Sequence, residues 1–298
     1  MSSLTHQEKT FRLPKRVVLV GGSGFIGKAL EPILQARGSE VLSLSSKQLD
    51  LADPSCVARL KEIVRPDDAV VYLACITPDR GKDAAAFVKN CAMAKHFSDF
   101  VEQASFSHLV TVSSDAIYND DQNPVNESSY CAPSSFYGCA HLARELMVKA
   151  AASKSKIRHV VVRPSAVYGL GDTHNGYGPN RFFKTALSQG KIQLFGQGEE
   201  KRDHIAIGDV CQLLVLILGH HSTGVLNLVT GNAVSFMEVA ELIAKKVGPA
   251  VQVEGSPRAN PITYRHFDIT STIQAFPQFQ WTSLDVGVTA LLEQLRRG

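Results

Sequence analysis

The stretch "RVVLVGGSGFIGKAL" (residues 16–30) decides the fold. Its apolar run at 16–22 predicts a strand buried on both faces, and helical spacing of apolar residues follows at once. Gly21 allows the sharp turn between them, Gly24 lets backbone amides approach a pyrophosphate, and Gly27 lets helix and strand pack closely. The helix N-terminus adds partial positive charge. In this context the three glycines predict a dinucleotide-binding turn.

The alternation of strand and helix continues through the first half of the chain. Short β-branched runs are separated by longer segments with helical spacing. This rhythm predicts a parallel sheet covered by helices and joined by right-handed crossovers. We therefore expect an α/β protein with a doubly wound, Rossmann-type parallel sheet. The expected strands are 16–22, 40–45, 68–75, 108–114 and 157–165, and the expected helices are 27–38, 54–64, 83–104 and 135–153.

A smaller, partly interleaved C-terminal substrate lobe is expected beyond Arg163, where the regular alternation stops. We assign 14–168, with returning segments at about 203–230, to the dinucleotide-binding domain, and 169–202 with 231–298 to the substrate lobe. The glycine-rich loop 168–180 is either a mobile loop over a cleft or an inert surface loop. The expected elements are strands at 192–196, 203–207 and 225–229, and helices at 180–189, 209–219, 235–247 and 283–297.

The composition excludes several classes of protein. With 44% hydrophobic and 20% charged residues among 298, the chain is expected to be soluble and globular. A net charge of +3 is too small to favour nucleic acid or an anionic membrane as a partner. No segment has the length of a bilayer-spanning helix, and the first residues lack the apolar centre of a signal peptide. The six cysteines form no C-x-x-C pair, which favours reduced thiols in the cytoplasm over disulfides or a metal site.

The end of the second expected strand bears on the choice of cofactor. NAD-selective sites usually have an acid there, which binds the ribose 2′-hydroxyl. Here Ser45, Ser46 and Lys47 stand in its place, a set that would tolerate a 2′-phosphate. We therefore expect NAD or NADP, with a slight preference for NADP; the alternative is that Lys47 is an ordinary solvated loop residue. Asp50 is a candidate for the adenine amino group or, alternatively, a helix-capping residue.

Two further stretches carry candidate catalytic groups and a family resemblance. "VTVSSDAIYND" (110–120) ends a strand with two serines, and Tyr137 opens a helix 23 residues after Ser114. Together with the glycine turn, these stretches resemble the extended short-chain dehydrogenase/reductase family, the NAD-dependent epimerase/dehydratase group. The resemblance covers nearly the whole chain, in the motifs "GGSGFIG", "LDLADP", "VYLACITPDRG", "SSDAIYND", "YGCAHLARE", "RPSAVYG" and "GQGEEKRDHIAIGDV".

The resemblance implies roles for these residues. Tyr137 matches the tyrosine that exchanges a proton with the sugar oxygen, and Ser114 matches the hydroxyl residue that hydrogen-bonds the same oxygen. Family members have a lysine four residues after the tyrosine, and this lysine lowers the tyrosine pKa and holds the nicotinamide ribose. The present chain has His141 at that position. An imidazole of pKa about 6.5 is mostly neutral at pH 7, so it polarises Tyr137 less. Glu145 on the same helical face would raise the pKa of His141 and restore some charge, whereas desolvation would act against this.

Other residues follow from the same resemblance. Arg202 matches the arginine that binds the substrate diphosphate, the alternative being an ion pair with Asp203 or Glu200. Asn180 matches a residue near the nucleotide, the alternative being an ordinary helix N-cap. Because Asp115 is followed by Ala116, the acidic pair that eliminates water is incomplete. The full set of implied cofactor-binding positions is Gly21, Gly24, Phe25, Ile26, Gly27, Ser45, Lys47, Asp50, Leu51, Leu73, Ala74, Asn90, Tyr137 and His141.

The sequence thus predicts a cytoplasmic NAD(P)-dependent enzyme, an epimerase or a keto-reductase, acting on a nucleotide sugar. The resemblance also implies a homodimer formed through the helices at 83–104 and 135–153. The alternative is a non-catalytic, dinucleotide-binding regulatory or assembly subunit, and His141 is the feature that favours it.

Overall fold

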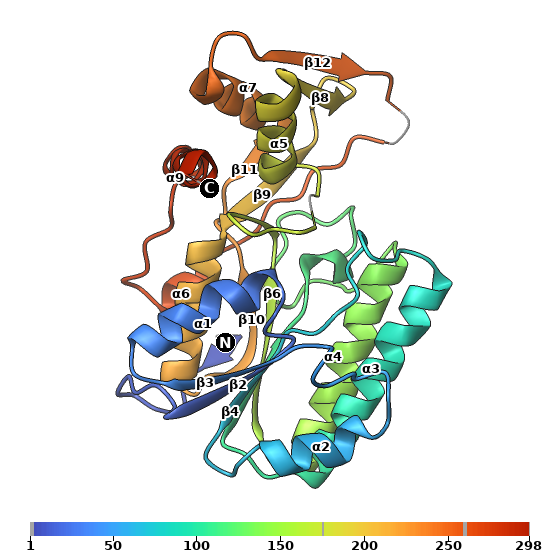
Figure 1. The fold of residues 1–298 in the computed structure, drawn as a ribbon, viewed down its shortest axis with the longest axis vertical. Coiled ribbons are helices and arrows are strands. Elements are labelled where there is room, and N and C mark those ends of the chain that lie inside the picture. Colours follow the sequence, from blue (N-terminus) through green and yellow to red (C-terminus); the bar gives the residue numbers. More distant parts are fainter. Residues whose placement is uncertain (1–2, 175, 259–260, 298) are drawn as a thin grey trace.

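The larger part of the molecule is built around a mostly parallel sheet (Figure 1). The computed structural model describes residues 3–174, 176–258 and 261–297. The strand order is β1-β10-β6-β5-β4-β2-β3, and only β1 runs antiparallel to its neighbour within this described sheet. The order reverses beside β2, which is where doubly wound sheets bind ligands, at the carboxyl ends of the strands. The strands are β1 (Leu4–Thr5), β2 (Arg16–Val20), β3 (Glu40–Leu44), β4 (Ala69–Tyr72), β5 (His108–Val112), β6 (Arg158–Pro164) and β10 (Thr223–Leu228).

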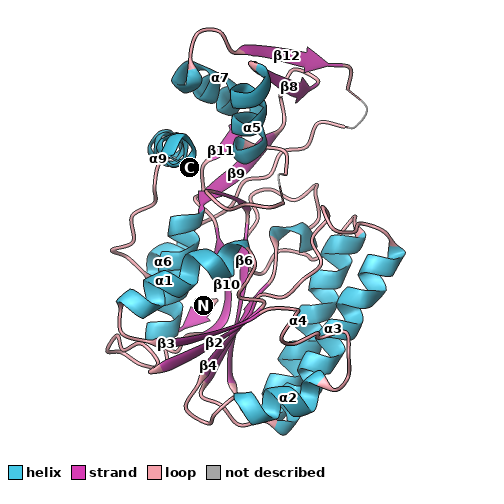
Figure 2. Cartoon of the chain, viewed as in Figure 1, coloured by secondary structure: helices cyan, strands magenta, loops and turns pink. Residues whose placement is uncertain are grey.

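Helices cover both faces of this sheet (Figure 2). On one face α1 (Phe25–Ala36) and α6 (Ile207–Gly219) pack on the strands through an aliphatic core. On the other face α2 (Cys56–Ile63), α3 (Ala84–Gln103) and α4 (Phe136–Lys154) pack through a core that includes stacked aromatic rings. The central strands are fully buried, as their continuous apolar runs predict. The predicted doubly wound Rossmann sheet is therefore confirmed.

A smaller part lies above the carboxyl ends of the strands in Figure 1. Its sheets have the strand orders β11-β9-β7 and β12-β8. The helices around them share an apolar core, and α7 begins with a capping box of Ser235 and Glu238. The elements are β7 (Ala166–Tyr168), α5 (Pro179–Gln189), β8 (Lys191–Phe195), β9 (Lys201–Ala206), β11 (Ala233–Ser235), α7 (Phe236–Val247), β12 (Gln252–Ser256) and α9 (Leu284–Arg297). Helix α8 (Thr270–Ala275) instead packs against β10 and β1 of the large sheet.

The differences from the sequence prediction concern short elements. The expected strands and helices are present with shifted ends, but β1, β7, β11, β12 and α8 were not predicted. These are two to six residues long, too short to show a periodic pattern. Strand β9, inside the segment expected to return to the large sheet, joins the small sheet instead. Among the described helices, none is long and apolar enough to cross a membrane.

Candidate functional site

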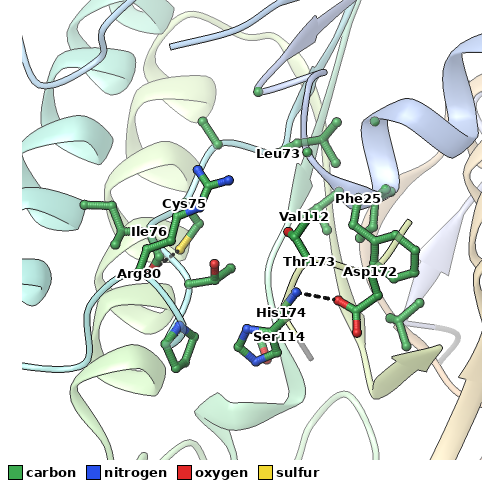
Figure 3. Close-up of a pocket in the computed structure, with 18 of the residues that line it drawn as sticks. Phe25, Leu73, Cys75, Ile76, Arg80, Val112, Ser114, Asp172, Thr173 and His174 are labelled. Carbon is green, nitrogen blue, oxygen red and sulfur yellow. Dashed lines mark hydrogen bonds between the residues drawn. The ribbon is translucent and has the colours of Figure 1, made fainter. Parts of the chain in front are cut away.

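A cavity of about 690 Å³ opens at the carboxyl ends of the central strands. Its walls come from the turn after β2, the loops after β3, β4 and β5, the start of α4, and the smaller part of the molecule. In Figure 3, Cys75, Ile76 and Arg80 lie on one wall, opposite Phe25 and Asp172. The cavity therefore lies between the two parts, at the position expected for a ligand of a doubly wound sheet.

The glycine turn that the sequence predicts forms one wall of the cavity. At Gly21 and Gly27 there is no room for a larger side chain. A Cβ atom at Gly21, where φ is +91°, would lie 2.6 Å from the Ala74 backbone nitrogen. A Cβ at Gly27 would lie 2.4 Å from the Gly22 carbonyl oxygen. At Gly24 a Cβ would meet only the Gly21 oxygen, at 3.3 Å. Gly24 is the N-cap of α1 and has no side chain to accept from the first helical amides, which suits an anion at this helix end.

Most of the expected cofactor positions line this one cavity. The exceptions are Lys47 and Asn90, which are absent from its described lining. The Asn90 side chain instead binds the backbone of Ile76, accepting from its nitrogen at 2.8 Å and donating to its oxygen at 3.0 Å. The preference for NADP rested partly on Lys47 and stays a prediction. The positions on the wall are Gly21, Gly24, Phe25, Ile26, Gly27, Ser45, Asp50, Leu51, Leu73, Ala74, Tyr137 and His141.

On the opposite wall, Asn180 binds a backbone segment with its side-chain amide, as Asn90 does. Its side chain accepts from the Gly169 nitrogen at 3.0 Å and donates to the Gly169 oxygen at 2.7 Å. The N-cap of α5 is Gly178, so Asn180 does not cap this helix. Residues of the glycine-rich loop also line the cavity, and His174 Nδ1 lies 2.8 Å from Asp79 Oδ1 of the facing loop. The loop therefore extends over the cavity, as one of the two interpretations proposes.

Ser114 and Tyr137 come together on the cavity floor. Ser114 follows β5, and Tyr137 stands in the first turn of α4, whose N-cap Ser135 accepts from the Gly138 nitrogen. A Cβ at Gly138 would lie 2.2 Å from the Ala116 oxygen, so this glycine allows α4 to start directly against the turn that carries Ser114. Burial raises the pKa of Tyr137 above its ordinary value, and hydrogen bonding to Ser114 opposes this only in part. At neutral pH the phenol of Tyr137 is therefore protonated.

His141 is buried and neutral, which decides between the two opposing effects on its charge. Its Nε2 lies 3.5 Å from Cys75 Sγ, and its ring stands edge-on to Tyr137 with 4.5 Å between ring centres. Burial, and then the charge of Arg144, lower the pKa of His141 well below its usual range. Of the two opposing effects weighed for His141, desolvation therefore dominates, and Glu145 does not restore its charge. Both carboxylate oxygens of Glu145 bind the Arg163 guanidinium on β6, at 3.0 and 2.7 Å.

Arg144 is a functional candidate that the sequence analysis missed. It is 3% exposed, and its guanidinium donates to the carbonyl oxygens of Tyr72, Ala74 and Val112, at the ends of β4 and β5. Among the described residues, no carboxylate forms an ion pair with it. Its charge lowers the pKa of Tyr137, so this buried cation acts in the direction that the family's lysine would.

Arg202 does not reach the cavity wall. Its guanidinium donates to the Thr263 oxygen at 3.0 Å and to the Lys201 oxygen at 2.9 Å. The alternative ion pairs are not formed either. Asp203 accepts from residues 165, 230 and 231, and Glu200 pairs with Arg258. The diphosphate role of Arg202 stays a prediction, and its guanidinium would have to leave Thr263 to fulfil it.

Comparisons with known proteins show which family and which proteins this chain is similar to. The model of the NAD-dependent epimerase/dehydratase family matches residues 17–229. A dTDP-glucose 4,6-dehydratase of Streptomyces niveus is 28% identical over 273 residues, covering 78% of each chain. An uncharacterized UDP-glucose epimerase, YtcB, of Bacillus subtilis is 24% identical over 315 residues, covering 95% of this chain and 99% of the relative.

Solved structures agree on the fold. The UDP-glucose 4-epimerase of Thermus thermophilus, crystallised with NAD, superposes with a TM-score of 0.82 at 22% identity, covering 94% of this chain and 99% of that one. RMD from Pseudomonas aeruginosa, in complex with NADPH, also gives 0.82, at 21% identity, with 95% and 100% covered. At these identities the likeness supports the Rossmann fold.

Proposed function

The chain belongs to the NAD-dependent epimerase/dehydratase family, and on this basis we propose that it is an NAD(P)-dependent enzyme acting on a nucleotide sugar. One observation carries the proposal. A glycine turn with an uncapped helix N-terminus and a Ser114–Tyr137 pair open into the same 690 Å³ cavity. Relatives and structural neighbours include epimerases and dehydratases of nucleotide sugars, which supports this substrate class.

The cavity walls fit a dinucleotide. We propose that the amides after Gly24 hold its pyrophosphate, because this helix start has no protein cap and a Cβ would narrow the turn. Ser45 and Asp50 would hold the adenosine half, and Tyr137 and His141 would border the nicotinamide half. A bound nicotinamide supplies the hydride chemistry that converts a sugar alcohol and a keto sugar into each other.

The protonation of the floor residues determines which proton steps are easy. Tyr137 holds its proton at neutral pH, so it is ready to donate it to the oxygen of a keto sugar while Ser114 hydrogen-bonds that oxygen. The reverse step, taking a proton from a sugar hydroxyl, requires the phenolate. His141 is neutral and contributes little to this, whereas Arg144 supplies a fixed positive charge close by. Net reduction of a keto sugar and the reductive half of an epimerisation are both consistent with this arrangement.

The second candidate is a non-catalytic, dinucleotide-binding regulatory or assembly subunit. The observation that favours it is the neutral, buried His141 at the position of the family's lysine. Such a protein would bind the dinucleotide tightly and transfer no hydride to any nucleotide sugar.

We propose that the protein works as a cytoplasmic homodimer. The adjacent helices α3 and α4 expose Val88, Phe136 and Leu146, at 62%, 48% and 62% of their surfaces, and a partner copy could bury these side chains. The described cysteines are free thiols, consistent with a reducing compartment. Sedimentation analysis of the purified protein tests the dimer, and a monomer at micromolar concentration would contradict it.

Small molecules that copurify with the native protein test the proposed function. Mass spectrometry should find a dinucleotide, and one that survives purification favours an epimerase. Stoichiometric consumption of added NADPH with a keto sugar nucleotide favours a reductase. The matched control is Tyr137→Phe, which should keep the dinucleotide and lose turnover. A wild-type protein that binds no dinucleotide would overturn the proposal.

A further inference from the structure

His204 is a buried polar side chain without a protein partner on the cavity wall. It belongs to β9, is 5% exposed, and lines the cavity close to Gly178. Among the described residues, neither Nδ1 nor Nε2 has a hydrogen-bond partner. Buried polar groups in native proteins are almost always hydrogen-bonded, so both ring nitrogens are open for partners from a ligand or from water.

The surroundings leave the ring accessible from the cavity. Its Cε1 atom would lie 3.3 Å from a Cβ at Gly178, and the glycine there leaves this edge uncovered. On the neighbouring strand β7, Ala166 pairs with His204 in register and also lines the cavity, but its methyl group offers no hydrogen bond. His204 thus offers two open ring nitrogens to a ligand, whereas the other buried polar group of this strand pair without a described partner, the Tyr168 hydroxyl, lies against Gly287 of α9, 1.9 Å from where a Cβ would stand.

A second, smaller pocket, also lined by His204, shows from which side a ligand can reach the ring. It has a volume of about 100 Å³ and is lined by His204 together with the polar residues Thr230, Asn232, Thr282 and Ser283. This space has room for roughly three waters and is too small for a sugar ring. A larger ligand must therefore reach His204 from the 690 Å³ cavity.

The chemistry of the ring indicates the class of group that it binds. Burial, and then the charge of Arg202, lower the pKa of His204 to about 4. The ring is therefore neutral at pH 7, with one nitrogen as donor and the other as acceptor. A hydroxyl group also donates and accepts, so hydroxyls of a sugar complement both nitrogens, whereas a phosphate accepts only.

We propose that His204 is a substrate-binding residue that hydrogen-bonds hydroxyl groups of the sugar. This inference rests on the proposed function, in which the dinucleotide occupies the glycine-turn side and leaves the β9 wall to the nucleotide sugar. The side chain contacts the substrate and has no part in the proton transfer of Tyr137.

Titration calorimetry with NAD-loaded protein tests this role. The variant is His204→Phe, which keeps a planar ring and removes both nitrogens. Its Kd for UDP-glucose should rise about tenfold or more, the equivalent of losing one or two hydrogen bonds. Its Kd for UDP and for NAD should stay unchanged. The matched control is His159→Phe, also a histidine whose burial lowers its pKa to about 4, but on β6 and absent from the cavity lining.

The possible results distinguish a failure of the role assigned to His204 from a failure of the proposed substrate class. Equal binding of UDP-glucose by wild type and His204→Phe would overturn the role of His204, because water then satisfies the ring. An equal loss for UDP and UDP-glucose would also overturn it, since the contact would lie with the nucleotide. If the wild type binds none of the UDP, dTDP, GDP or ADP sugars, the proposed substrate class fails and the inference fails with it.

A measurement on the wild type covers the case in which His204→Phe does not fold. With ¹⁵N-labelled histidine, the ring nitrogen signals of His204 should shift on addition of UDP-glucose and stay in place on addition of UDP. Signals that respond to neither ligand, while calorimetry records sugar-nucleotide binding, would contradict the inference.

Discussion

Replacing His141 by lysine should make the oxidation of a sugar hydroxyl faster. The imidazole is neutral, and its ring centre lies 4.5 Å from that of Tyr137. If an ammonium stood at this separation from the phenol oxygen, an effective dielectric constant of about 20 gives an attraction of roughly 4 kcal/mol for the phenolate. That energy corresponds to a fall of between about two and three units in the pKa of Tyr137.

The expected gain is smaller than this limit. A lysine at position 141 would be buried beside Arg144, and both burial and the like charge lower its own pKa. We therefore expect a rise of about tenfold or more in the rate at which a nucleotide sugar reduces bound NAD at pH 7. Because this step needs the phenolate, the rate rises with pH, and lysine should move the rise to lower pH.

Stopped-flow absorbance of the reduced nicotinamide, recorded across the pH range, measures both effects. The matched control is His141→Gln, which is neutral and should give no gain. If His141→Lys binds cofactor and substrate but is no faster than wild type, and its pH profile is unmoved, the polarisation argument is wrong.

Three further predictions concern the cofactor turn and stability. Gly24→Ala should fold normally, since the new Cβ meets only the Gly21 oxygen, at 3.3 Å. Calorimetry should show that this variant binds NAD at least about tenfold more weakly, and an unchanged affinity would argue against a pyrophosphate at this turn. Glu145→Gln leaves the Arg163 charge buried without its carboxylate partner, so the free energy of unfolding in urea titrations should fall by about 3–5 kcal/mol. A loss of less than about 1 kcal/mol would contradict a stabilising buried pair. Burial lowers the pKa of His108 to about 3 and of His159 to about 4, so the unfolded chain binds more protons below pH 6.5. Stability should be full above this pH and fall towards pH 4, by up to about 1.4 kcal/mol per pH unit for each histidine; equal urea midpoints at pH 7 and pH 5 would refute this.

The sequence carried enough information for the large sheet. Its strands are continuous apolar runs, and Gly21 and Gly27 of the first turn stand where a Cβ would collide with backbone. The short strands β7 and β11 give no such signal, because three residues cannot show alternation and their pairing with β9 depends on distant segments. Local patterns therefore predict the elements that are long and buried.

The site was predictable to the extent that it depends on motifs. Ser114 and Tyr137 lie together because strand and helix ends fix them. The partners of Glu145 and Arg202 were not predictable, since Arg163 and Thr263 are brought to them only by the tertiary fold. Arg144 carried no distinct signal, because Glu145 and Lys149 stand in the same helical stretch, and the strand-end carbonyls that bind it cannot be read from the sequence.

Transfer of an isotope from sugar to cofactor tests the central claim most directly. NAD-loaded protein is mixed with nucleotide sugars deuterated at the carbon that is oxidised, and the nicotinamide is examined by mass spectrometry. We expect deuterium on the nicotinamide with wild type and none with Tyr137→Phe. Tightly bound NAD that acquires no deuterium from any nucleotide sugar would contradict the enzymatic account and favour a dinucleotide-binding subunit.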